Sequence, residues 1–205
     1  MIKIISPLTS LRRTTGLVAA VLLFPLWSGP LPLWAAEASA LVDDFSSPEH
    51  TSSGAGRMVI TDKDAGGQSM AAATYAGGVL KMDGKLAPGR GMPGFVSVPL
   101  MLNPTAQPQD LSAFTGVRLR VKVTQGMLMV QVASAAITNF DFHTSAAIVR
   151  QPGDFQEVRI PFAKMNRAWS EQVPLNLKVI TSVNLVAAGM APGAFTYEVD
   201  EIGFY

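Results

Sequence analysis

Apolar and charged side chains alternate along this chain, and that pattern restricts its fold more than any other feature. Residues 117–123 read Val-Arg-Leu-Arg-Val-Lys-Val without a break in the alternation. Successive side chains of a β-strand point to opposite faces, so this pattern predicts a strand with one buried and one solvated face. The same period of two recurs in residues 128–132, 158–162 and 195–199, whereas no stretch keeps a helical apolar stripe for three turns.

Turn-forming residues divide the rest of the chain into short segments. Gly-Gly pairs stand at residues 66–67 and 77–78, and Pro-Gly pairs at 88–89, 152–153 and 192–193. Charged residues make up 15% of the chain, below the average of roughly 25%. Short strands at this spacing predict an all-β sandwich or barrel that extends as one domain over residues 41–205.

The first forty residues have the parts of a secretory signal peptide. Lys3, Arg12 and Arg13 precede an apolar run at residues 16–27, and Ala38-Ser39-Ala40 offers a cleavage site. The alternative is an uncleaved membrane anchor, although prolines and glycines interrupt the second half of the apolar segment. We therefore expect a periplasmic or secreted domain, anchored in the inner membrane if residues 1–40 are not removed.

The charge balance of the remaining chain argues against a nucleic-acid partner. Without the signal segment, thirteen basic side chains stand against fourteen acidic ones, so no excess of positive charge is available for phosphates. The chain contains no cysteine, which excludes disulfides, thiolate metal sites and cysteine nucleophiles.

Several segments, taken in order, resemble the complex I intermediate-associated protein 30 family, which is similar to some carbohydrate-binding modules. One of them, Asp64-Ala65-Gly66-Gly67-Gln68-Ser69, is similar to that family's Asp-x-Met-Gly-Gly-x-Ser motif, with Ala65 where the family usually has Met. Phe155 stands where a Trp is common in the family. The other matching segments are residues 42–45, 94–97, 110–121, 155–162 and 195–205.

This resemblance covers nearly the whole predicted mature chain. It implies a galactose-binding-like jelly roll, in which two antiparallel sheets stack and the two termini lie close together. The family's members are linked to assembly of membrane redox complexes, which implies a protein partner.

Outward-facing polar side chains on several predicted strands are candidates for a concave ligand-binding face. Guanidinium groups bind carboxylates, phosphates or sugar hydroxyls. A row of outward-facing charged side chains is, however, also typical of a solvated sheet face. The candidates are Arg118, Arg120, Lys122, Gln131, Glu157, Arg159 and Glu198.

Three further residues join this candidate set. Asp141 and His143 lie in residues 140–143, a predicted strand, where both would point to the same face. Thr144 would point to the opposite face, so a hydrolase triad around this pair is disfavoured. Trp169 is the only tryptophan after the signal segment, and aromatic faces commonly bind sugars.

Acidic residues at the two ends of the domain suggest one structural metal site. In a jelly roll with adjacent termini, Asp44 and Asp200 would supply carboxylate oxygens to a calcium ion, the hard cation that such ligands prefer. The alternative is that both side chains only bond to backbone at the sheet edge.

These observations favour an exported, non-catalytic binding module. Its expected role is to bind a protein and to help assemble or stabilise an envelope or membrane complex. The alternative is a carbohydrate-binding module that recognises a small glycan on the concave sheet face. No residue is predicted to be catalytic, because no titratable group stands in a convincing cleft.

Overall fold

The computed structural model describes residues 41–205, so the predicted signal segment, residues 1–40, lies outside the described residues. Within this range the helices are three short 3-10 turns, η2 (Asp62–Ala65), η3 (Phe162–Lys164) and η4 (Leu177–Val179). The strands are β1 (Leu41–Asp43), β2 (Ile60–Thr61), β3 (Met70–Ala76), β4 (Val79–Leu86), β5 (Gly94–Met101), β6 (Gly116–Gln125), β7 (Met127–Ser134), β8 (His143–Thr144), β9 (Ile148–Val149), β10 (Gln156–Pro161), β11 (Ile180–Gly189) and β12 (Gly193–Phe204).

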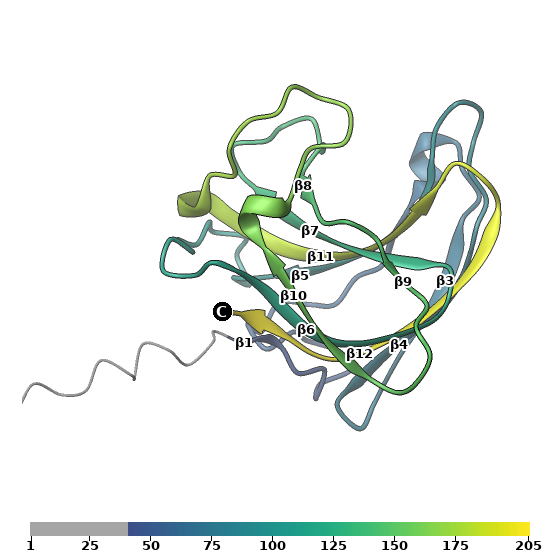
Figure 1. Ribbon diagram of the computed structural model, residues 1–205, viewed down its shortest axis with the longest axis horizontal. Coiled ribbons are helices and arrows are strands. Elements are labelled where there is room, and N and C mark those ends of the chain that lie inside the picture. The colour runs from purple at the N-terminus through teal and green to yellow at the C-terminus, as the bar shows by residue number, and fades with distance from the viewer. Residues whose placement is uncertain (1–40) are drawn as a thin grey trace, which may run out of the picture. The chain divides into compact units, whose positions relative to one another are not determined.

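The strands form two antiparallel sheets that stack as layers (Figure 1). One sheet has the order β10-β6-β12-β4-β3, with β1 also paired to β12, and is called the β12 sheet here. The other has the order β2-β5-β11-β7-β8, with β9 also paired to β7, and is called the β11 sheet. The predicted all-β, two-sheet antiparallel sandwich is therefore confirmed.

The core lies between the sheets and is built from the apolar half of each alternating strand. Val121 of β6 and Val199 of β12 face Leu128 of β7 and Leu185 of β11, and all four side chains are fully buried. Removing such a side chain from water contributes about 1.5–3 kcal/mol. The period of two therefore fixes which face of each strand is internal.

The first and last strands of the domain are neighbours, because β1 pairs with β12. Next to this pair, a buried carboxylate and a buried guanidinium join the 46–57 loop to the sheet. Arg57 Nη2 donates to Asp43 Oδ1 at 3.0 Å, and the exposed fractions of the two side chains are 5% and 0%. The Arg57 guanidinium also lies over the rings of Phe45 and Tyr75. The predicted closeness of the termini of this domain is confirmed.

One local prediction needs correction. The strand expected at residues 140–143 is reduced to β8, His143–Thr144, because Phe140 adopts a left-handed backbone with φ 61° that no strand tolerates. Residues 71–76, although rich in helix-forming alanine, are part of strand β3, since pairing with β4 outweighs helix propensity. The short helices among residues 41–205 include none with the length and hydrophobicity needed to span a bilayer.

Candidate functional site

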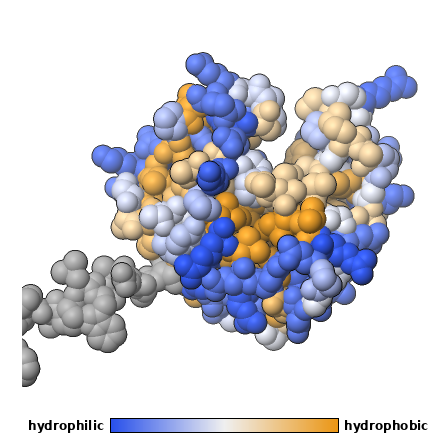
Figure 2. Space-filling view, viewed as in Figure 1, coloured by the Kyte–Doolittle hydropathy of each residue, from blue (hydrophilic) through white to orange (hydrophobic). Residues whose placement is uncertain are grey.

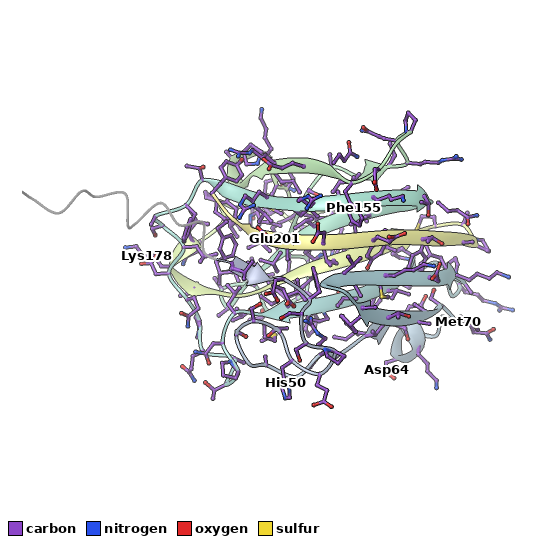
Figure 3. All side chains as sticks on the ribbon, turned by 90° about the horizontal axis from the view of Figure 1, so that it is seen from below. His50, Asp64, Met70, Phe155, Lys178 and Glu201 are labelled. Carbon is purple, nitrogen blue, oxygen red and sulfur yellow. The ribbon has the colours of Figure 1, made fainter. Side chains whose placement is uncertain are left out.

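The outer face of the β12 sheet, seen in Figure 3, carries most of the predicted ligand-binding residues. Most of them form ion pairs with neighbouring side chains on this face. Arg118 Nη2 lies 2.6 Å from Glu201 Oε1, and Arg120 forms an ion pair with Asp200. Lys122 Nζ lies 3.7 Å from Asp154 Oδ1. We call this surface the charged face; its ion pairs leave few charged groups without a partner of the opposite sign.

The next strand continues the same pattern. Arg159 Nε donates to Glu157 Oε1 at 2.7 Å within β10. This hydrogen bond and the charge of Arg159 hold the pKa of Glu157 below its ordinary value. Glu198 of β12 stands between Lys122 of β6 and Lys81 of β4 in the strand register. Alternating charges across neighbouring strands are typical of a solvated sheet face.

The predicted set does not share one face. Gln131 lies on β7, on the outer surface of the other sheet, because alternation specifies the side of a strand but not the sheet that the strand joins. Asp141 and Trp169 lie in loops, and His143 is buried at the start of β8. Their shared role in ligand binding stays a prediction.

The outer face of the β11 sheet is recessed and carries no charge. Its three long strands, β5, β7 and β11, contain no Asp, Glu, Lys, Arg or His. Asn184 and Val186 of β11 point away from the core, yet their exposed fractions are only 6% and 7%. In Figure 2 the surface is hollowed between two raised parts, with apolar colours at the base of the hollow. We call this hollow the groove.

The polar side chains on the floor of the groove bond to one another. Ser182 Oγ donates to Asn184 Oδ1 at 2.7 Å, and Asn184 Nδ2 donates to Gln131 Oε1 at 3.3 Å. Gln131 Nε2 in turn donates to Thr144 Oγ1 at 3.1 Å. This chain runs across β11, β7 and β8, so much of the floor's hydrogen-bonding capacity is used internally. In the strand register, Pro99 lies opposite Asn184, and Val186 of β11 lies opposite Met129 of β7, so apolar side chains border these polar groups.

Loops form the two walls of the groove. On one side of the β11 sheet rise residues 135–142 and 165–177, and on the other rise residues 87–93 and the β11–β12 turn (Figure 1). The first wall carries two highly exposed aromatic side chains, Phe140 at 75% and Trp169 at 69%. The second carries two exposed methionines, Met92 and Met190. Large apolar side chains exposed around a recess mark a surface suited to binding.

The first wall is held by Asp141, whose side chain is buried. Its Oδ1 accepts from the backbone N–H of Ala168 at 2.8 Å, and its Oδ2 accepts from those of Trp169 at 3.0 Å and Ser170 at 2.6 Å. Burial raises the pKa of Asp141, but these hydrogen bonds outweigh burial and hold the pKa below its ordinary value. Arg167 Nε lies 3.9 Å from the same carboxylate. Asp141 therefore fixes the turn that presents Trp169.

His143 has a different environment from the one expected. Its side chain is buried, and Nε2 lies 2.7 Å from the carbonyl oxygen of Val173; because a carbonyl only accepts, Nε2 carries the hydrogen. Nδ1 has no hydrogen-bond partner among the described residues. The ring lines a cavity of about 500 Å³ beneath residues 163–177, together with Phe162, Met165 and Leu175. Because Asp141 bonds to residues 168–170, the two do not form an acid–base pair.

The candidate metal ligands have different partners. Asp44 Oδ1 accepts from the backbone N–H and the hydroxyl of Ser46, and these bonds lower the pKa of Asp44. Asp200 pairs with Arg120 on the charged face. Within residues 41–205, no group of three or more histidine or acidic side chains is placed to hold a metal ion. Structural calcium at these two residues stays an untested expectation.

The groove was not predicted from the sequence, although the outward positions of three strands indicate it. Residues 94–101, 127–134 and 180–189 are strands whose outward positions hold Ser, Asn, Gln, Met and Val instead of charges. An antiparallel sheet whose two faces both lack charge has its outer face shielded from solvent or used for binding.

Comparison with known families gives one match over most of the described chain. The family model described as Complex I intermediate-associated protein 30 (CIA30) matches residues 44–199. No curated protein matches this chain.

Solved structures with the same fold include carbohydrate-binding modules and part of an agarase. The family 11 carbohydrate-binding module from Clostridium thermocellum, in complex with a β-1,3-1,4-mixed-linked tetrasaccharide, is 15% identical with a TM-score of 0.56, covering 81% of this chain and 94% of that one. The family 11 module of the cellulosomal cellulase Lic26A-Cel5E of Clostridium thermocellum is 15% identical with a TM-score of 0.55, covering 80% and 93%. An agarase, AgWH50C, is 10% identical with a TM-score of 0.51, covering 80% of this chain and 24% of the enzyme. At these identities the likeness shows the jelly-roll fold alone.

Proposed function

Because this chain belongs to the complex I intermediate-associated protein 30 family, we propose that it is a non-catalytic module that binds a protein partner in the groove of the β11 sheet. The partner segment presents apolar side chains to the floor and to the exposed aromatic side chains of the wall. In this proposal the module acts after export, on the outer side of the inner membrane, as an assembly or stabilising factor for an envelope or membrane complex.

One observation carries the choice of the groove over the charged face. The long strands of the groove hold no charged side chain, and the floor amides bond to each other, so the surface offered to a ligand is mainly apolar. On the charged face, ion pairs such as Arg118–Glu201 already occupy the guanidinium groups. A ligand there would have to separate existing pairs, whereas burial of apolar surface in the groove is favourable at about 25 cal/mol per Å².

The chemistry of the wall favours a polypeptide as the ligand. Phe140 and Trp169 expose ring surface, and Met92 and Met190 add flexible, polarisable contacts that adapt to varied side chains. Aromatic residues and methionine are enriched in the buried centres of protein interfaces. The family's description, which associates its members with an intermediate of complex I, also supports a protein partner.

Affinity capture from native envelope membranes tests this proposal. The bait is the tagged full chain, compared with a double variant, Phe140→Ser with Trp169→Ser, whose positions are exposed enough to leave the core intact. The matched control is Glu157→Ser with Arg159→Ser on the charged face, which removes an exposed ion pair. We expect the wild-type chain and the control to retain the same partner and the groove variant to lose it. Equal capture by the groove variant, or no partner for the wild-type chain, would contradict the proposal.

A small glycan is the second candidate ligand of the same groove. The exposed rings of Phe140 and Trp169 are of the kind on which sugars stack, and the fold is shared with a module solved with a mixed-linked tetrasaccharide. Calorimetric titration with that tetrasaccharide separates the two ligands. Saturable binding that disappears in the groove variant would favour the glycan, and the protein proposal predicts no heat of binding.

A further inference from the structure

The cavity beside His143 is a second recess of this molecule, and its lining differs from the floor of the groove. It lies beneath residues 163–177 and encloses about 500 Å³. Apolar side chains, among them Phe162, Met165 and Leu175, form most of its lining. Pockets that hold small molecules in proteins typically measure about 300–1,000 Å³ and are mostly apolar. The size and the lining of this cavity therefore fit a small, largely apolar molecule.

The cavity is buried at its base and accessible at its rim. Phe162 and Met165 at the base are only 6% and 4% exposed. Ala163, Asn166 and Val173 line the same cavity and are exposed. A ligand therefore reaches the base from solvent without unfolding of the core.

The two amide side chains that line the cavity bond to the backbone of the same loop. Asn166 Nδ2 donates to the carbonyl oxygen of Lys164 at 3.3 Å. Gln172 Oε1 accepts from the backbone N–H of Arg167 at 3.0 Å, and Gln172 Nε2 donates to the carbonyl oxygen of Arg167 at 2.8 Å. These hydrogen bonds hold the loop over the cavity. The imidazole of His143 differs from both amides.

The strand register directs His143 into the interior. His143 lies opposite Val132 of β7, a fully buried core residue, and directly opposite side chains share one face of a sheet. Nε2 donates to the carbonyl oxygen of Val173 at 2.7 Å, which leaves Nδ1 of the neutral ring as an acceptor. The residue is 3% exposed, and Nδ1 has no hydrogen-bond partner among residues 41–205. Buried polar atoms are nearly always hydrogen-bonded, so this nitrogen is suited to a donor that enters the cavity.

We propose that this cavity binds a small molecule with an apolar body and a single hydroxyl group, which donates to Nδ1 of His143. The apolar body packs against Phe162, Met165 and Leu175. No Asp, Glu, Lys or Arg of the described residues lines the cavity, so a charged ligand would be buried without a counter-charge. A sugar would bury several hydroxyl groups beside one acceptor, so the site selects against glycans. This proposal does not depend on a protein partner in the groove.

Two probes that differ in one group test the role of Nδ1. They are 2-naphthol and 2-methylnaphthalene, in which a methyl group replaces the hydroxyl, and each is titrated into the full chain while backbone amide chemical shifts are recorded. The variant His143→Gln keeps a donor for the carbonyl oxygen of Val173 but places no acceptor where Nδ1 lies. We expect its dissociation constant for 2-naphthol to rise at least about tenfold, because the buried hydroxyl loses its acceptor, and that for 2-methylnaphthalene to change less than about threefold. Equal changes for the two probes would overturn the role of Nδ1.

A second pair of variants tests whether the probes bind in this cavity. Ala163→Phe fills the cavity from its exposed rim, and we expect it to weaken the binding of both probes at least about tenfold. The matched control is Ala113→Phe, in an exposed turn that does not line the cavity, which should bind both probes as the wild-type chain does. Unchanged binding by Ala163→Phe, or no saturable shift of the amides of residues 162–177 in the wild-type chain, would overturn the proposal.

Discussion

Replacing Asp141 with Asn should destabilise the wall of the groove, because the carboxylate is the acceptor of three consecutive backbone N–H groups. Oδ1 accepts from Ala168, and Oδ2 accepts from Trp169 and Ser170. In Asp141→Asn one of these oxygens becomes an NH2 group, which donates. Whichever orientation the amide adopts, at least one of these part-buried N–H groups loses its acceptor.

The expected loss in the free energy of unfolding follows from the contacts of the Asp141 carboxylate. An unsatisfied buried donor costs about 1–3 kcal/mol, and hydrogen bonds to a charged acceptor are worth more than those to a neutral amide. The Arg167 side chain, 10% exposed, also loses the opposite charge beside it. We expect the free energy of unfolding to fall by about 2–4 kcal/mol, which lowers the melting temperature by roughly 5–15 °C in a domain of this size.

The lowered pKa of Asp141 determines how the loss of stability in Asp141→Asn depends on pH. The pKa of Asp141 is lowered from 3.8 in the folded chain, so the ionised carboxylate stabilises the fold fully at pH values above 3.8. This stabilisation is lost as the pH falls through the lower pKa that Asp141 has in the folded chain. The difference in stability between the wild-type chain and Asp141→Asn should therefore be largest above about pH 5 and shrink below about pH 4.

Urea denaturation across this pH range, with hydrogen exchange of the three amides, measures the effect. The control is Asp154→Asn, at an exposed side chain that forms a surface ion pair, for which we expect a change of at most about 0.5 kcal/mol. A loss below about 1 kcal/mol for Asp141→Asn, or amides that exchange no faster than in the wild-type chain, would refute the reasoning.

Three other substitutions test the packing of the sandwich by chemical denaturation. Gly67→Ala places a Cβ 2.1 Å from the carboxyl carbon of Asp62, so the free energy of unfolding should fall by about 1–3 kcal/mol; an unchanged midpoint would contradict that contact. Arg57→Ala leaves the buried Asp43 without its counter-charge and should cost about 3–5 kcal/mol; a loss below 1 kcal/mol would contradict a buried pair. Tyr197→Phe removes a buried hydroxyl that has no partner among the described residues, so it should raise the melting temperature; a decrease would indicate a bond to that hydroxyl.

The sequence predicted the layers of the fold well because side-chain alternation is a local property. In β6, Val117, Leu119 and Val121 are buried as their period of two requires, and Arg118 and Arg120 are on the solvated side. Pairing between distant strands is not local. The alternation in residues 127–134 does not specify that this segment joins the sheet opposite to β6, although only Gly126 separates the two strands.

The candidate site was harder to predict because loops position it. Asp141 was selected for its closeness to His143, but its partners are backbone amides 27 to 29 positions further along the chain. Similarly, the family motif pointed to Asp64, whereas the buried carboxylate of that turn is Asp62, which accepts from the backbone and hydroxyl of Ser69. Contacts made by backbone leave no pattern in the side-chain sequence.

Site-specific photo-cross-linking in intact cells tests most directly whether the groove, and not the charged face, binds the partner. A photoreactive phenylalanine analogue replaces Trp169 on the groove wall in one strain and Arg159 on the charged face in another; both side chains are exposed. Our account predicts a cross-link to one envelope protein from position 169 and none from position 159. A cross-link from position 159 alone would contradict it.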